Sequence, residues 1–211
     1  MTDHISTRQP HDGETDERDG LFPLGSGAMS QLRARLAAQA GQRGLIDIAY
    51  RSVDTPVGPL LLAATEAGLV RVAFEREGFE SVLETLAARI SPRVLESPRR
   101  LDTAAVELEE YFAGRRHDFD LPLDHALSSG FRRSVQTSLP RIGYGRTRSY
   151  KEIAELVGSP RAVRAVGTAC ATNPLPVVLP CHRVLRSDGA LGGYIGGLEA
   201  KRALLSLEQG A

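Results

Sequence analysis

The character of the chain changes near Ser128, and this change restricts the possible folds more than any other feature of the sequence. Before Ser128 the apolar segments are short and β-rich, and turns containing glycine and proline separate them. We expect strands at 45–55, 58–65, 68–75 and 117–124. Helical periodicity predicts two helices in the same block, at 79–90 and 99–115. Together these elements predict an α+β fold with an antiparallel sheet.

After Ser128 the sequence favours helices, turns and arginines. We expect helices at 128–142, 150–158, 161–172 and 198–208. Gly158 ends the second of these helices, and Ser159 with Pro160 is typical of the start of the next. Two short helices joined by a tight turn predict a unit like a helix-turn-helix, whose second helix would enter a groove of DNA.

Composition and pattern divide the chain into four parts. Residues 1–28 have few aliphatic side chains and predict a disordered acidic leader, and 29–44 predicts a short helix. We place an α+β N-terminal domain at 45–125 and a helical C-terminal domain at 126–211. No segment has the ~18 consecutive apolar residues of a membrane span, and the polar start lacks the apolar core of a signal peptide. We therefore expect a cytoplasmic protein that does not contact a membrane.

The formal net charge of zero conceals an uneven distribution. Residues 128–186 contain ten Lys or Arg and two Asp or Glu, a balance of +8, and the rest of the chain carries −8. A concentrated basic segment indicates phosphate contacts with a nucleic acid, because such contacts depend on local charge. The neutral total argues weakly against nucleic-acid binding. A solvated basic face is the alternative, and composition alone leaves the two interpretations about even.

The chain has two cysteines, Cys170 and Cys181, which are too few for a disulfide framework or a cysteine-rich zinc site. His117 and His125 lack suitable partners, so we expect no metal site. In a reducing compartment both thiols would be free. No neighbour of Cys170 would activate its thiol, so we expect a small buried side chain there.

Cys181 lies in the run VLPCHRVLRS, directly before His182 and Arg183. A thiol attacks as the thiolate, which a neighbouring histidine can generate as a base, directly or through a water. Successive side chains of an extended segment point to opposite faces, so this role requires a turn at Pro180 or a bridging water. A buried, inert cysteine is the alternative.

The segment NPLPVVLPCHRVLRSDGALGGYIGG resembles the active-site region of the O6-alkylguanine-DNA alkyltransferases, also called methylated-DNA–protein-cysteine methyltransferases. The resemblance extends back through YGRTRSYKEIAELVGSPRAVRAVGTACATNP and forward to Glu208. TPVGPLLLAATEAGLVRVAFE is similar to the N-terminal β-hairpins of that family. The resemblance implies a small RNase H-like antiparallel domain, followed by a mainly helical domain that carries the whole site.

The resemblance also implies a reaction. The alkylated guanine would be flipped out of the duplex, because its O6 cannot be reached inside the stack. Cys181 would accept the alkyl group from O6 of guanine, and in the same way from O4 of thymine, with His182 as a base acting through water and Glu208 orienting His182. Each molecule would react once, without a cofactor, because no group is placed to regenerate the thiol.

Further roles follow from the same resemblance, and each of these residues could instead be structural. Arg164 matches an arginine that fills the gap left by the flipped base, Tyr150 a tyrosine that helps to rotate the 3′ phosphate, and Asn173 a hinge asparagine. Additional contacts to DNA are expected from Arg148, Arg161 and Arg183. The pocket wall is expected from Val184, Tyr194, Ile195 and Gly196. Some relatives have serine at the position of Ile195, so the range of alkyl groups stays open.

The expected partner is double-stranded DNA containing O6-alkylguanine, bound by a monomer, with cooperative binding along DNA left open. Two other readings are a non-catalytic sensor of the lesion and a DNA-binding regulator. Sensors of this type carry tryptophan where this chain has Cys181, and a regulator would not need the glycine-rich loop or Glu208. A cysteine hydrolase would need a second, distant histidine in a suitable context.

Overall fold

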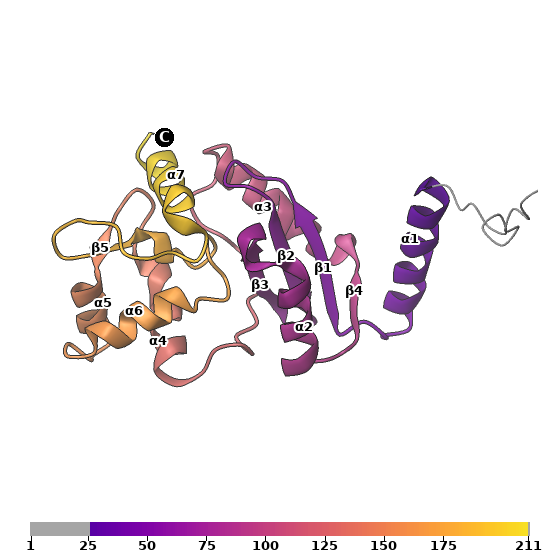
Figure 1. The fold of residues 1–211 in the computed structure, drawn as a ribbon, viewed down its shortest axis with the longest axis horizontal. Coiled ribbons are helices and arrows are strands. Elements are labelled where there is room, and N and C mark those ends of the chain that lie inside the picture. Colours follow the sequence, from indigo (N-terminus) through magenta and orange to yellow (C-terminus); the bar gives the residue numbers. More distant parts are fainter. Residues whose placement is uncertain (1–25, 211) are drawn as a thin grey trace, which may run out of the picture.

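The computed structural model describes residues 26–210, so the leader expected over 1–28 lies almost entirely outside the described residues. The first described element is α1 (Ser26–Gln42), which matches the helix expected at 29–44 but begins three residues earlier. It stands apart from the body of the molecule (Figure 1) and exposes Leu32 and Leu36.

The N-terminal half forms a four-stranded sheet in the order β3-β2-β1-β4. Its strands are β1 (Ile48–Val53), β2 (Leu60–Thr65), β3 (Gly68–Phe74) and β4 (Val94–Glu96). The first three pair antiparallel, as expected. The sequence did not indicate β4, which pairs parallel to β1, because three residues are too few for an alternating pattern.

Alternation of side chains along the strands gives the sheet two buried faces. Leu61 and Ala63 pack with α2 (Phe79–Arg89), which covers one face. Leu60 and Leu62 point the other way, toward α3 (Asp102–Phe112), because successive side chains of a strand lie on opposite faces. A 3₁₀ turn (Pro98–Leu101) precedes α3, so the helix expected at 99–115 is shorter than predicted.

The prediction of a strand at 117–124 is wrong. This segment makes a single isolated bridge, Leu69 to Leu123, beside the edge strand β3. The N–H of Leu69 donates to Pro122 O at 2.8 Å, but Pro122 itself has no N–H with which to continue a ladder. The approach is so close that a Cβ on Gly68 would lie 2.2 Å from Pro122 O, and only glycine can occupy that position.

The C-terminal half is mainly helical, as expected (Figure 1). Its helices are α4 (Gly130–Ser138), α5 (Tyr150–Leu156), α6 (Val163–Ala171) and α7 (Gly197–Gln209), with 3₁₀ turns at Leu139–Arg141 and Cys181–Arg183. Two short strands, β5 (Arg148–Ser149) and β6 (Val184–Leu185), pair parallel. This pair brings the start of α5 next to the end of the Cys181 turn.

The turn between α5 and α6 differs from the expectation. Gly158 ends α5 in a left-handed conformation (φ 71°), as its position indicated. Ser159 and Pro160 do not start α6, because the chain makes one more turn, closed by a bond from Ala162 N to Ser159 O at 2.8 Å. The helix begins at Val163, so six residues separate the two helices where one or two were expected.

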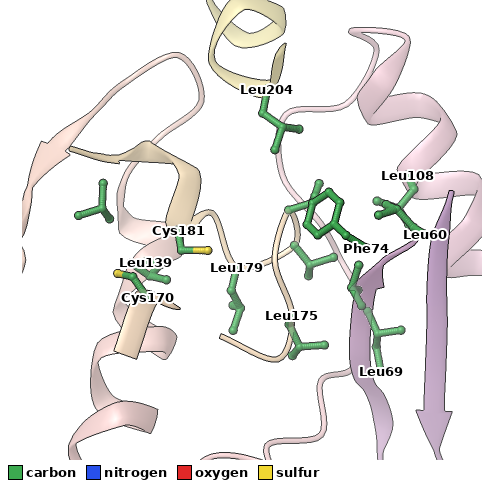
Figure 2. Close-up of a cluster of buried hydrophobic side chains, with 14 of the residues drawn as sticks. Leu60, Leu69, Phe74, Leu108, Leu139, Cys170, Leu175, Leu179, Cys181 and Leu204 are labelled. Atoms are coloured by element: carbon green, nitrogen blue, oxygen red, sulfur yellow. The ribbon is translucent and has the colours of Figure 1, made fainter. Parts of the chain in front are cut away.

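The two halves share one apolar core (Figure 2). Leu60, Phe74 and Leu108 of the N-terminal half belong to the same buried cluster as Leu179 and Cys181. The segment that carries Cys181 therefore lies against the junction between the halves. No helix among residues 26–210 is long and apolar enough to cross a membrane.

Candidate active site

Asn173 organises the segment that leads to Cys181. Its side chain is fully buried, and Nδ2 donates to Leu179 O at 2.8 Å and to Cys181 Sγ at 3.2 Å. Its Oδ1 accepts from Leu175 N at 3.0 Å. One amide thus ties both ends of the loop together, and the hinge role expected for Asn173 stays a prediction. Within this loop Val177 has a φ of 73°, the only positive φ of a non-glycine residue in the described part of the chain.

Cys181 is 2% exposed and begins a 3₁₀ turn after Pro180, so the chain bends at the proline as the proposed chemistry requires. Burial raises the pKa of the Cys181 thiol to about 11, although the Asn173 hydrogen bond and the charge of Lys201 act in the opposite direction. The thiol is therefore protonated at neutral pH, and its reactivity depends on a base.

His182 is fully buried, and its Nε2 lies 2.8 Å from Glu208 Oε1. Burial lowers the pKa of His182, while Glu208 raises it in part, so the ring is neutral in the resting site. A carboxylate only accepts hydrogen bonds, so Nε2 carries the proton and Nδ1 is free to accept one. Nδ1 is buried without a hydrogen-bond partner among the described residues.

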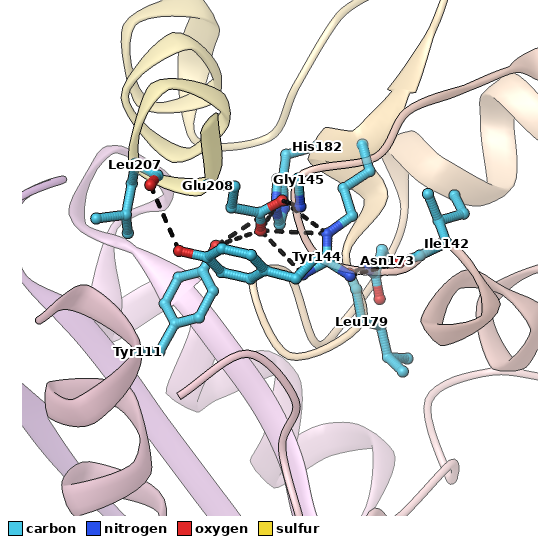
Figure 3. Close-up of polar contacts among 10 residues, drawn as sticks. Tyr111, Ile142, Tyr144, Gly145, Asn173, Leu179, His182, Leu207 and Glu208 are labelled. Atoms are coloured by element: carbon cyan, nitrogen blue, oxygen red, sulfur yellow. Dashed lines mark hydrogen bonds and ion pairs between the residues drawn. The ribbon is translucent and has the colours of Figure 1, made fainter. Parts of the chain in front are cut away.

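Glu208 is the centre of the polar network (Figure 3). Besides His182, the carboxylate accepts bonds from Arg183 Nε at 2.9 Å, from the Tyr111 hydroxyl at 2.7 Å and from Gly145 N at 3.2 Å. Burial by itself would raise the pKa of Glu208, but the hydrogen bonds from His182, Arg183 and Tyr111 outweigh it and lower the pKa to about 2. The group is thus a carboxylate at every working pH.

Two buried residues near this site were not predicted from the sequence, and of these only Tyr111 contacts the Glu208 carboxylate. Tyr111 is buried on α3, where its position on the apolar face of a predicted helix indicates only core packing. Lys201 is buried on α7 and donates to Val184 O at 2.7 Å, behind the Cys181 turn. No local pattern distinguishes either residue, because both meet the site through contacts between segments distant in sequence.

Among the residues expected to form the pocket wall, Tyr194 lies beside His182 with ring centroids 6.3 Å apart, and Val184, Tyr194 and Ile195 belong to one apolar cluster. Val184 is fully buried, and Ile195 is half-buried. The Tyr194 ring lies edge-on to Phe74 with centroids 5.6 Å apart, and its hydroxyl has no partner among the described side chains and backbone. A Cβ at Gly196 would lie 2.6 Å from the Phe74 ring, so this close packing requires glycine.

Tyr150 is the first residue of α5 and lies against the glycine-rich loop. A Cβ on Gly192 would approach its hydroxyl to 2.2 Å. Burial raises the pKa of Tyr150, and the nearby thiols of Cys170 and Cys181 add to the effect. The structure therefore brings Tyr150 to the same side of the molecule as the reactive cysteine.

The basic segment has an exposed face and one buried member. Arg161 and Arg164 are exposed, before and in the first turn of α6, and Arg148 is exposed with an ion pair to Glu152 at 2.8 Å. All basic side chains of 128–186 are exposed except Arg183.

Arg183 does not occupy the position predicted for a DNA contact. It is 3% exposed, and its guanidinium is held by Glu208 and by Ile142 O at 2.5 Å. A buried guanidinium whose donors are already bound cannot also reach a phosphate, so its role lies inside the network.

The other titratable candidates form no second site. Cys170 is 5% exposed on α6, and burial raises its pKa further than that of Cys181. Within residues 26–210, no group of three or more His, Cys, Asp or Glu side chains could hold a metal ion. His117 stacks on Tyr144 with ring centroids 4.0 Å apart.

Comparisons with known proteins agree with this geometry. The family model for the 6-O-methylguanine DNA methyltransferase DNA-binding domain matches residues 130–210, and the model for its ribonuclease-like domain matches 48–125. The methylated-DNA–protein-cysteine methyltransferase of Methanosarcina barkeri is 42% identical over 160 residues, which are 76% of this chain and 96% of the relative. The constitutive methylated-DNA–protein-cysteine methyltransferase of Bacillus subtilis is 42% identical over 161 residues, or 76% of this chain and 94% of the relative.

Solved structures lead to the same family. The crystal structure of Mycobacterium tuberculosis OGT in complex with DNA superposes with a TM-score of 0.67 at 38% identity, covering 77% of this chain and 93% of that chain. The O6-methylguanine methyltransferase of the same organism gives a TM-score of 0.68 with the same coverage. The RNase H-like N-terminal domain predicted from the hairpins is confirmed by the ribonuclease-like match. The chain belongs to the methylated-DNA–protein-cysteine methyltransferase family.

Proposed function

We propose that the protein repairs alkylated DNA by transferring an alkyl group from O6 of guanine, and in the same way from O4 of thymine, to Cys181. The observation that carries this proposal is the arrangement of Cys181, His182 and Glu208. A buried thiol held by Asn173 precedes a neutral histidine, whose Nε2 is bound to a carboxylate and whose Nδ1 is free. Relatives at about 40% identity bear the name of this activity.

The reaction needs the thiolate of Cys181, but the buried site keeps this thiol protonated at neutral pH. His182 Nδ1 takes the proton of Cys181 through one water, and Glu208 stabilises the imidazolium that results. The thiolate then attacks the alkyl carbon. The new S–C bond forms as the C–O6 bond breaks, and the leaving guanine takes up the proton held by the His182 imidazolium, which regenerates the neutral ring. The product is a thioether, and Cys170 is buried with a raised pKa, so it cannot act as a second nucleophile to release the alkyl group.

DNA binding would involve the exposed basic face of the C-terminal half. We assign Arg164 to the space left by the flipped base and Arg148 and Arg161 to phosphates, because all three are exposed near α5 and α6. Tyr150 and the Val184–Gly196 wall would receive the flipped base.

We propose a boundary between the two domains near 126. We also propose that the protein binds double-stranded DNA containing O6-alkylguanine as a monomer, and that it acts in the cytoplasm, where the thiols stay reduced.

Intact-mass measurement tests the proposal. The protein is incubated with a duplex containing one O6-methylguanine, and the modified peptide is then mapped, with Cys181→Ala as the control. We expect the mass of one methyl group on Cys181, never more than one per molecule, and none on the variant. Tight and lesion-selective binding without any mass change would contradict the proposal and indicate a lesion sensor.

A further inference from the structure

The hydroxyl of Tyr111 is the one side-chain group of the N-terminal half that reaches the Glu208 carboxylate among the described residues. Tyr111 lies on α3, inside the segment matched by the ribonuclease-like model, whereas His182 and Glu208 lie inside the DNA-binding match. Its hydroxyl donates to Glu208 Oε1 at 2.7 Å, the same oxygen that accepts from His182 Nε2 at 2.8 Å. The tyrosine oxygen and His182 Nε2 are 3.5 Å apart. The three groups therefore form one buried cluster across the junction of the halves (Figure 3).

Aromatic packing fixes the direction of this hydroxyl. The Tyr111 ring contacts Phe112 and Phe119 with centroids 5.3 Å away in each case, and Tyr144 edge-on at 6.1 Å. The side chain is fully buried, and burial next to Glu208 raises its pKa above the usual range. The hydroxyl thus remains a proton donor at every working pH, aimed at a single carboxylate oxygen.

We infer that Tyr111 is a positioning residue for alkyl transfer, through which the N-terminal half holds Glu208 and keeps His182 neutral, with Nε2–H directed at the carboxylate and Nδ1 free. A carboxylate that orients a catalytic histidine acts through its own direction and basicity, and its hydrogen-bond donors set both. The inference rests on the proposed function. It adds that the chemistry depends on how the two halves are packed, although every reacting atom of the protein lies in the C-terminal half.

Removing the Tyr111 hydroxyl should change the pKa of His182 in one definite direction. With one donor fewer, Glu208 Oε1 holds the imidazolium form of His182 more strongly, so the pKa of His182 rises. Protonated His182 cannot take a proton from the thiol. The acid limb of the pH–rate profile therefore moves to higher pH. The titratable and charged groups around this cluster are Glu77, Tyr144, Cys181, Arg183, Tyr194, Lys201 and Glu208, and the change leaves all of them in place.

The experiment measures single-turnover methyl transfer from an O6-methylguanine duplex between pH 5 and 9 for the full-length wild type and Tyr111→Phe. Tyr144→Phe is the matched control, because its hydroxyl lies in the same aromatic cluster but bonds to Leu207 O at 3.4 Å instead of Glu208. We expect a rate about 10-fold lower near neutral pH for Tyr111→Phe, the usual worth of a hydrogen bond to a charged group. We expect a raised acid limb for this variant alone, with unchanged duplex affinity in a Cys181→Ala background.

A second variant keeps the shape of the side chain. Fluorinated tyrosine at position 111 makes the hydroxyl a stronger donor, so its acid limb should move to lower pH, opposite to that of Tyr111→Phe. Uniform loss of rate at every pH, matched by Tyr144→Phe, would overturn the inference and leave Tyr111 as a packing residue. Identical pH–rate profiles for wild type and Tyr111→Phe would also overturn the inference.

The protonation state of His182 gives a readout that does not depend on transfer. Nitrogen-detected NMR of the imidazole should show the neutral Nε2–H form in the wild type and a larger fraction of the imidazolium form in Tyr111→Phe at the same pH. If the wild type transfers no methyl group, the proposed function fails, and this measurement still decides the role of Tyr111. An unchanged fraction of imidazolium together with an unchanged pH profile would exclude the positioning role.

Discussion

At the scale of single residues, the site depends on groups that are costly to bury unless they are paired. Arg183 and Glu208 are both almost fully buried and bonded to each other at 2.9 Å. Such a pair is expensive to bury, but removing one partner is more expensive, because it leaves the other charge uncompensated. The same carboxylate bonds His182 at 2.8 Å, so its structural role and its proposed chemical role coincide in one side chain.

The Glu208→Gln substitution should therefore affect both reactivity and stability. Methyl transfer should fall on the order of 100-fold, because the imidazolium loses its counter-charge. The free energy of unfolding near neutral pH should fall by about 3 kcal/mol, because Arg183 stays buried without a charged partner. Urea denaturation and single-turnover kinetics measure the two effects.

The stability difference should also depend on pH. The pKa of Glu208 is lowered from 4.5 to about 2 by folding, so its contribution is present above 4.5 and is lost as the pH falls toward 2. The difference in the free energy of unfolding between wild type and Glu208→Gln should therefore narrow as the pH falls from 4.5 toward 2. The control is Glu155→Gln, which removes an exposed carboxylate 4.0 Å from Lys151. A gap that stays constant from pH 7 to pH 2 would contradict the assignment.

At the scale of elements, local chemistry indicated the end of α5 correctly but not the start of α6. Gly158 ends α5, as its freedom to adopt a positive φ indicated. Ser159 and Pro160 are common at helix starts, yet here they form an extra turn before α6. Pro122 similarly interrupts the strand expected at 117–124. In each case the same residue types are compatible with two local structures, and packing against a neighbour selects one.

The first turn of α6 should matter for extrusion of the base and not for the thiol. Arg164 is exposed there and lies outside the Glu208 network. Arg164→Ala should slow transfer from a duplex about 10-fold or more, while transfer from the free O6-alkylated base stays near the wild-type rate. The comparison variant is Arg89→Ala, at the end of α2 in the other half. Equal loss with both substrates would show that Arg164 is structural.

At the scale of the whole molecule, opposite charges are separated along the chain. The +8 of residues 128–186 is displayed on the C-terminal half, and all but one of its basic side chains are exposed. Long-range attraction to phosphates should therefore come from this half alone, despite a net charge of zero.

Affinity for duplex DNA should consequently fall as salt concentration rises. Each phosphate neutralised by an exposed Lys or Arg releases counterions, with a slope of roughly −0.9 per contact in a plot of log affinity against log salt. Fluorescence anisotropy of a labelled duplex from 50 to 300 mM salt measures this slope. Arg161→Ala should make the slope less steep by about one. Binding that does not change with salt would contradict the assignment of the basic face.

The sequence by itself determined the class of fold and indicated the run that carries the proposed reactive pair, Cys181 and His182. Short β-rich segments bounded by turns predicted β1 to β3, and helical periodicity predicted α2 to α7 within a few residues. Cys181 and His182 were recognisable from an unbroken run. These features depend on residues close together in the chain, where propensity and spacing act directly.

The tertiary structure alone decided which distant groups meet at the site. Tyr111 and Glu208 are 97 residues apart, and only the packing of α3 against α7 and the Cys181 turn brings them within 2.7 Å. The same packing buries Arg183, although its positive charge and the basic segment around it predicted an exposed side chain. An arginine or tyrosine is compatible with solvent, DNA or a buried network, and its partners determine which of these it occupies. Those partners come from segments that are distant in the sequence. No local pattern predicts that such segments meet, because their contacts stabilise the protein only after the two halves have packed together.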